Sequence, residues 1–215
     1  MECEVSSVLT GTVAPFGTKG EPSGYRKTIR TGKVAVAAWG LAGDEQADLV
    51  HHGGTDKAIH HYALDHYPAW IAERPDLRDI FRQPGAFGEN VASSGWVEED
   101  ICIGDRFRMG TAIVEVSQGR QPCWKLGHRF GDASMMTRVI ETGRAGWYYR
   151  VIENGAIEAG DCIRLLDRPH PQWSVSRVFR ILIAREPTAL EDIAALARVP
   201  QLSRSWHIRC RTMLA

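Results

Sequence analysis

Residues 101–118, ICIGDRFRMGTAIVEVSQ, carry the strongest indication of the fold. Two runs rich in β-branched and aromatic residues flank Gly110, and apolar and other residues alternate along the second run. In an extended strand, Val114 and Val116 point to one face while the residues before and between them point to the other. The stretch therefore predicts a β-hairpin that turns at Gly110.

Further short β-prone runs lie on both sides of this hairpin, most of them bounded by glycine or aspartate. They are VSSVLTGTV (5–13), KVAVAAWG (33–40) and DCIRLLD (161–167). Twisted strands separated by turns are typical of a barrel rather than of a flat sheet. We therefore expect a mainly β domain, a β-barrel interrupted by helices, over residues 1–167.

Two helices are expected inside this domain. The first covers residues 55–73, where apolar residues recur at helical spacing, and Pro68 would kink or divide it. The second covers residues 132–142, with Asp132 placed to cap its start and Gly143 placed to end it.

The stretch DRPHPQW (167–173) contains two prolines and predicts a linker. Three short segments with helical patterns follow it, at 174–184, 188–199 and 203–214. These roughly 40 residues are too few to bury a full core alone. We therefore expect a small three-helix unit over residues 174–215 that docks on the barrel or on a partner.

Composition narrows the function classes. The chain has 215 residues, which suits one sizeable core, and its 26 basic and 26 acidic residues produce no long-range field toward nucleic acid or anionic membranes. No window approaches the roughly 20 apolar residues of a membrane span. The N-terminus lacks the basic and apolar stretches of a secretory signal. We expect a cytoplasmic protein that binds neither nucleic acid nor membranes.

Cys123 stands out among five widely spaced cysteines. It follows the strand predicted over 111–118 and lies in SQGRQPCWKLGHRF, where Arg120 and Lys125 would lower its pKa. Pro122 suits the first position of a helix, which would place Cys123 in the first turn, near the positive end of the helix dipole. Because a thiolate is a nucleophile or a soft metal ligand, we expect Cys123 to have a chemical role and the other cysteines to pack as small apolar residues.

The segment HHGGTDKAIHHY (51–62) places Gly53 and Gly54 directly before the first expected helix and Lys57 in its first turn. Backbone amides at such a helix start approach a phosphate closely, and Lys57 would add a full charge. Spacing alone fits an ordinary turn before a helix equally well. His60 and His61 would face apart by about 100° on a helix, which favours hydrogen-bonded histidines over a metal site.

Four segments, in their order along the chain, resemble the MOSC (molybdenum cofactor sulfurase C-terminal) domain family, and within it the YiiM-type branch of hydroxylaminopurine-resistance proteins. They are GLAGDEQADLVHHGGTDKAIHHY (40–62), PGAFGEN (84–90), SQGRQPCWKL (117–126) and TGRAGWYYRVIENGAIEAGD (142–161). The resemblance covers roughly residues 10–165 and implies a β-barrel with a few helices. The predicted C-terminal helices resemble the three-helix unit often appended in this branch.

The resemblance also implies a cofactor and its ligands. Cys123 occupies the place of the cysteine that binds molybdenum in a molybdopterin cofactor. Basic and polar groups of the other segments would hold the cofactor, and we take as candidates Gly53, Gly54, Lys57, His60, Asn90 and Arg120, with Lys27 as a weaker one. Gly119 and Thr55 depart from the family pattern, which usually has proline at both places.

On this basis we expect a molybdenum-cofactor-dependent reductase of N-hydroxylated small molecules, such as N-hydroxylated bases and amidoximes, with His60 as a candidate proton donor. The chain contains no GxGxxG fingerprint and no cysteine cluster for iron and sulfur, so a separate reductase should supply electrons. Two alternatives remain open. One is a sulfur carrier with a persulfide on Cys123, and the other is a cysteine hydrolase with His60 or His128 as the base.

Overall fold

The centre of the molecule is a closed, mixed β-barrel. The computed structural model describes residues 1–48 and 53–215. Within them seven strands pair in the order β1-β13-β9-β10-β11-β7-β8 and return to β1. β7 and β8 pair in parallel, whereas the other barrel neighbours are antiparallel. The predicted mainly β barrel with interrupting helices is confirmed.

The barrel strands are β1 (Glu2–Thr10), β7 (Ile59–Ala63), β8 (Val91–Ser93), β9 (Arg106–Met109), β10 (Ala112–Gly119), β11 (Trp147–Glu153) and β13 (Cys162–Asp167). Short strands surround them. β4 (Thr28–Ile29) extends the sheet beside β1. A separate three-stranded sheet consists of β5 (Val34–Ala37), β6 (Gly40–Leu41) and β12 (Gly155–Ile157). A hairpin consists of β2 (Ala14–Phe16) and β3 (Glu21–Ser23).

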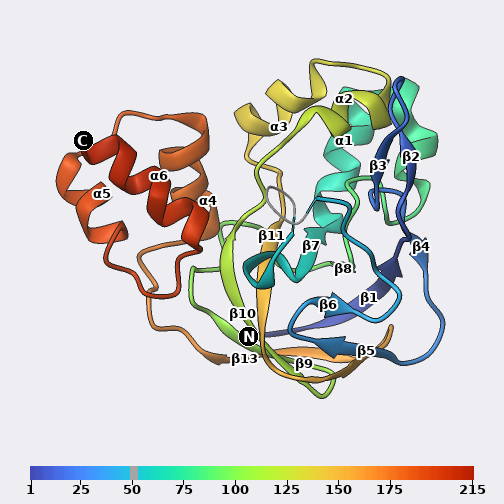
Figure 1. The fold of residues 1–215 in the computed structure, drawn as a ribbon, viewed down its shortest axis with the longest axis horizontal. Coiled ribbons are helices and arrows are strands. Elements are labelled where there is room, and N and C mark those ends of the chain that lie inside the picture. The colour runs from blue at the N-terminus through green and yellow to red at the C-terminus, as the bar shows by residue number, and fades with distance from the viewer. Residues whose placement is uncertain (49–52) are drawn as a thin grey trace.

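The helices form two groups (Figure 1). One group lies at the end of the barrel, near the hairpin of β2 and β3, and comprises α1 (Tyr67–Glu73), α2 (Trp124–Phe130) and α3 (Met135–Thr142). The other group lies beside the barrel and comprises α4 (Val175–Phe179), the π-helical turn η4 (Arg180–Ala184), α5 (Leu190–Leu196) and α6 (Arg204–Leu214). Three 3-10 segments connect the barrel elements: η1 (Thr55–Lys57), η2 (Leu64–His66) and η3 (Pro75–Arg82).

The hairpin predicted at Gly110 is confirmed as β9 and β10. Gly110 has φ 56°, and a Cβ there would lie 2.4 Å from the carbonyl oxygen of Ala156, so glycine is required at this turn. Val114 and Val116 are fully buried in the barrel. Glu115 points the other way and is also buried, because two arginines form ion pairs with it.

The helix predicted over residues 55–73 is wrong. Only its last seven residues, α1, are α-helical, whereas Ile59–Ala63 form strand β7 with a 3-10 turn on each side. Each residue of β7 is buried, because the strand pairs with β11 on one side and β8 on the other. Such a strand shows no alternation of polar and apolar residues. Pro68 lies in the first turn of α1, where its missing N–H breaks no hydrogen bond.

The second predicted helix is confirmed as α3, and Gly143 ends it with φ 72°. The cap differs from the prediction by two residues. Ser134 is the N-cap, and Asp132 stabilises the turn before it by accepting a hydrogen bond from the Ser134 backbone N–H at 2.8 Å.

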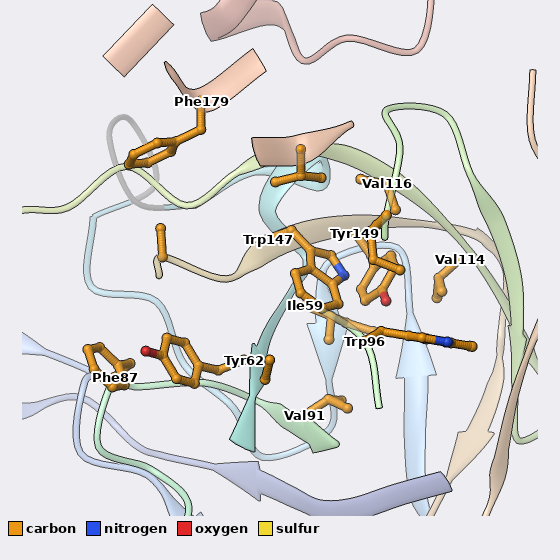
Figure 2. Close-up of a cluster of buried hydrophobic side chains, with 14 of the residues drawn as sticks. Ile59, Tyr62, Phe87, Val91, Trp96, Val114, Val116, Trp147, Tyr149 and Phe179 are labelled. Carbon is orange, nitrogen blue, oxygen red and sulfur yellow. The ribbon is translucent and has the colours of Figure 1, made fainter. Parts of the chain in front are cut away.

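The three predicted C-terminal helical segments are present and pack on the barrel. Phe179 of α4 belongs to the same buried apolar core as Trp147 and Tyr149 of β11, and Figure 2 labels all three side chains. Trp206 of α6 joins the same core. The predicted division of the chain into a domain over 1–167 and a unit over 174–215 stays a prediction. Across the described residues, we find no helix with the length and apolar character needed to cross a bilayer.

Candidate functional site

A pocket of about 630 Å³, counting the part open to solvent, lies where β7 begins and β10 ends, near the loops before β4 and after β6. Its lining includes the predicted site residues Lys27, Lys57, His60, Asn90, Arg120 and Cys123. The structure thus brings together six side chains from four separate segments of the chain. The lining also includes Tyr25, Asp44, Glu45, Gln121, Lys125 and Tyr148.

Gly53 and Gly54 do not line this pocket, and the α-helix predicted to start after them is wrong, whereas a cofactor contact of these glycines stays a prediction. η1 is a single 3-10 turn of three residues, with Gly54 before it at φ 97°. Residues 49–52, which precede it, lie outside the described residues. Lys57 does reach the pocket, and burial lowers its pKa. The lysine of this segment therefore contributes charge without help from a helix dipole.

Cys123 is the N-cap residue of α2, with an extended backbone at φ −141°. The predicted position in the first helical turn is wrong by one residue, because Trp124 begins the helix and Pro122 precedes the cap. The side chain is half-buried and lies at the pocket wall. A sulfur at this place is accessible from the pocket and is also close to the cations that line it.

Arg120 is a buried cation that faces the pocket. Its side chain is 4 % exposed, and its Nη1 atom has no hydrogen-bond partner among the described residues. Its backbone N–H donates to the carbonyl oxygen of Gly146 at 2.9 Å, which fixes the segment before Cys123. Burial acts against the cation, but the neighbouring Tyr25 and Cys123 outweigh it and leave the pKa of Arg120 above its usual value. A buried guanidinium with an unused donor is suited to an anionic ligand.

His60 and His61 point to opposite sides of β7. The prediction that they face apart is confirmed, although they do so in a strand rather than in a helix. His60 faces the pocket and is buried, and its Nε2 atom has no partner in the described part of the chain. Burial, and then the charge of Arg120, hold the pKa of His60 well below its usual value. His60 is therefore neutral at physiological pH.

His61 faces the barrel interior, where its ring nitrogens lie 3.1 Å from the Tyr149 hydroxyl and 2.8 Å from the Ser93 hydroxyl. Burial lowers its pKa to about 3. Both ring nitrogens are used inside the protein, so His61 belongs to the core rather than to the site.

Asn90 holds the pocket wall together. Its Oδ1 accepts from the His60 backbone N–H at 3.1 Å, and its Nδ2 donates to the Leu9 carbonyl at 3.2 Å and to Asp44 Oδ2 at 2.8 Å. Asp44 also forms a buried ion pair with Lys27. Burial lowers the pKa of Lys27, and the charge of Asp44 opposes this shift. Asn90 is thus committed to protein contacts, while Lys27 adds a buried cation to the pocket.

Asp44, Tyr25 and Tyr148 are among the lining residues that the sequence analysis did not predict. Asp44 lies in GLAGDEQAD, a stretch that predicts only a turn, and its pairing with Lys27 joins segments that show no common pattern. Tyr25 and Tyr148 enter the pocket from a loop and from β11. The only available signal for Tyr148 was its place in a segment that resembles the family. No local pattern marks Tyr25.

The charges around the pocket suit an anionic ligand. Four basic side chains line the pocket, Lys27, Lys57, Arg120 and Lys125, against two carboxylates. In residues 1–48 and 53–215 no three histidine, cysteine, aspartate or glutamate side chains are grouped to hold a metal ion. A metal here would need ligands from its own cofactor, to which Cys123 adds one sulfur.

Comparison with known proteins identifies the family. The family model described as "MOSC domain" matches residues 48–164. A protein of Gibberella moniliformis named "Reductase" is 43 % identical over 195 residues, which cover 90 % of this chain but only 34 % of that protein. The chain thus spans about a third of the length of this relative. YflK of Bacillus subtilis is 42 % identical over 185 residues, covering 83 % of this chain and 79 % of YflK.

YiiM of Escherichia coli is 38 % identical over 161 residues, covering 75 % of this chain and 71 % of YiiM. Its crystal structure superposes with a TM-score of 0.83 and 29 % identity, covering all of this chain and 92 % of YiiM. The match therefore includes the C-terminal helices as well as the barrel. The chain belongs to the MOSC domain family, in its YiiM-type branch.

Proposed function

We propose that this protein is a molybdenum-cofactor-dependent reductase of N-hydroxylated compounds, such as N-hydroxylated bases and amidoximes, with Cys123 as the protein ligand to molybdenum. Membership of the MOSC family supports a function connected with the molybdenum cofactor, and the relative named as a reductase supports an oxidoreductase. The N-hydroxylated substrate class and the individual residue roles are our proposal.

One observation carries the proposal. In the described residues, Arg120, which lines the pocket beside Cys123, has a buried Nη1 atom without a hydrogen-bond partner. Burying a cationic donor without a partner is costly, so its presence beside the pocket points to a ligand that supplies the partner. An anionic, hydrogen-bonding cofactor of the molybdopterin kind does this, while Cys123 supplies the sulfur.

The chain's own residues have distinct roles in this proposal. Arg120, Lys57 and Lys27 bind the negative groups of the cofactor, and Asn90 holds the backbone of His60 in place. When bound, the molybdenum centre supplies the two-electron chemistry that cleaves an N–O bond. His60 orients a polar group by a hydrogen bond rather than as an imidazolium acid, since its lowered pKa leaves no acidic proton on the ring at neutral pH.

Electrons must come from another module. The part of the Gibberella reductase outside the matched region amounts to about two-thirds of that protein, since the match covers 34 % of it. We propose that a reductase supplies electrons to the present chain, either as a separate protein or as an attached domain. A cytoplasmic location, and the absence of nucleic-acid and membrane partners, stay predictions.

The cysteine hydrolase alternative finds no support in the pocket. A hydrolase needs a base oriented by a third group, yet no described carboxylate is hydrogen-bonded to His60, and His128 packs its ring against Phe16 at 4.6 Å between centroids instead of lining the pocket. A sulfur carrier would use the same cysteine and has no separate structural feature in its favour.

The test is metal and pterin analysis of protein made in cells that synthesise molybdopterin. We expect about one molybdenum per chain in the wild type and at least a tenfold loss in Cys123→Ser, because serine is a poor ligand for a soft metal centre. Cys162→Ser, at an exposed cysteine of β13, is the matched control and should keep its metal. Equal molybdenum in wild type and Cys123→Ser would refute the assignment, and a persulfide on Cys123 without metal would favour the carrier.

A further inference from the structure

The C-terminal helix α6 begins at the segment that carries the pocket residues. The backbone N–H of Ser203, its N-cap residue, donates to the carbonyl oxygen of Ser117 at 2.9 Å. In the next residues of the helix, the Ser205 hydroxyl donates to Gln118 Oε1 at 2.9 Å. Both acceptors lie at the end of β10, directly before Arg120.

The same helix start also contacts η1, which carries Lys57. The backbone N–H of Arg204 donates to Asp56 Oδ2 at 2.9 Å. The other oxygen of Asp56 accepts from Arg150 at 2.8 Å, and Arg150 in turn donates to the carbonyl oxygen of Gln201 at 2.8 Å. Asp56 therefore links η1 both to β11 and to the residues that lead into α6.

Gly119 leaves room for this contact. A Cβ at Gly119 would lie 3.0 Å from the Trp206 ring, 3.2 Å from Val175 and 3.5 Å from Phe179, all in the C-terminal helices. Trp206 is 1 % exposed, so its ring has little space to move. The backbone at Gly119 has no positive φ, so glycine is needed here for close approach rather than for an unusual conformation.

One turn further along α6, Arg209 Nη2 donates to Gln121 Oε1 at 3.2 Å. Gln121 lines the pocket between Arg120 and Cys123. The helix and its N-cap therefore contact four of the five residues of segment 117–121, through a backbone hydrogen bond, a side-chain hydrogen bond, close packing and a second side-chain hydrogen bond.

We propose that α6 sets the position of the pocket: by binding segment 117–121 and Asp56 together, it makes Arg120, Cys123 and Lys57 face one site. Ser205, Trp206 and Arg209 are then positioning residues, and the C-terminal helices are a working part of the site rather than an appended unit. This inference rests on the proposed function only for the identity of the ligand in the pocket.

The test is hydrogen exchange measured by mass spectrometry on the full chain, purified from cells that lack molybdopterin. In Gly119→Ala we expect exchange in peptides covering 119–123 to accelerate about tenfold, while peptides from β9 and β13 exchange at the wild-type rate.

A gentler pair of variants keeps the test valid if Gly119→Ala folds poorly. Arg209→Gln should accelerate exchange at 119–123 about threefold, whereas Arg211→Gln, at an exposed position of the same helix, should not. Unchanged exchange at 119–123 in both Gly119→Ala and Arg209→Gln, or equal acceleration in the remote strands, would overturn the proposal. Since the assay uses cofactor-free protein, its result is independent of whether the protein is a molybdenum reductase.

Discussion

The carboxylate of Asp44 accepts a hydrogen bond from the side-chain amide of Asn90 at 2.8 Å and, in the same place, neutralises the buried ammonium group of Lys27. Asp44 also accepts from the backbone N–H of Gly11 at 2.8 Å. One carboxylate thus joins the loop after β1, the loop after β6 and the loop before β8. The wall of the pocket depends on it.

Asp44→Ala should therefore destabilise the fold strongly. The substitution leaves Lys27 as a buried charge without its partner, and removing one member of a buried pair costs about 3–5 kcal/mol. We expect a loss of this size in the free energy of unfolding, measured by urea denaturation at pH 7. The double variant Lys27→Met with Asp44→Ala should recover part of the loss, because it no longer buries an unpaired charge. A loss below about 1 kcal/mol in Asp44→Ala would show that Lys27 is well solvated.

Replacing Arg120, unlike replacing Asp44, should not destabilise the fold, because we propose that Arg120 binds the cofactor rather than another part of the protein. Arg120→Met removes a buried cation whose Nη1 has no protein partner among the described residues, so thermal stability should stay the same or increase. Bound molybdenum should fall at least tenfold. Melting temperature and metal content, measured on the same preparation, check both parts.

Arg168→Met is the matched control for Arg120→Met. Arg168 Nη2 lies 2.6 Å from Oδ2 of Asp105, a fully buried carboxylate outside the pocket. Its loss leaves Asp105 unpaired, so the melting temperature should fall while the metal content is kept. If Arg120→Met destabilised the protein as much as Arg168→Met, Arg120 would be a structural residue.

The barrel could be predicted because its antiparallel strands carry local signals. The run 101–118 alternates around a glycine turn, and β9 and β10 form there as expected. β7 could not be predicted in this way, because it is buried on both sides and its apolar residues continue into α1 at a spacing that also fits a helix. Its pairing in parallel with β8 joins residues about 30 positions apart, which no local pattern reveals.

The residues of the candidate site also differ in whether a local pattern in the sequence could identify them. Cys123 and Arg120 lie in one short basic segment, and local charge was enough to single them out. Asp44 and Tyr25 reach the pocket only through the closure of the barrel and its loops. The contact between α6 and Gly119 is a still longer-range feature, because it depends on where a separate group of helices docks.

His61 should make the protein sensitive to acid. Its pKa is about 3 in the folded chain, whereas an unfolded histidine titrates near 6.5. Between these values unfolding takes up a proton, so the free energy of unfolding falls as the pH falls, by about 1.4 kcal/mol per pH unit for this group. His61→Gln should remove that contribution, and urea unfolding at pH 7.5, 6.5, 5.5 and 5.0 measures the difference between the two proteins.

Above pH 7 His61 is deprotonated in both the folded and the unfolded chain, so the stability difference between wild type and His61→Gln should no longer change with pH. This range serves as the internal control. Parallel stability curves down to pH 5 would mean that His61 is not held neutral by its burial.

Gly146 should be indispensable both to the fold and to the pocket. It has φ 76°, and a Cβ there would lie 2.3 Å from the carbonyl oxygen of His61 and 2.9 Å from Nε2 of His60. Gly143 has a similar φ of 72° but no atom within 4 Å of an added Cβ. Gly143→Ala should therefore lower the free energy of unfolding by only about 1 kcal/mol, the cost of a left-handed backbone at a residue with a Cβ. Gly146→Ala should lose several times more in urea unfolding and should also lose its bound molybdenum, because the methyl group displaces the His60 ring. If both variants lost the same free energy of unfolding, the loss would come from the left-handed backbone alone, and the added methyl group would not displace His60.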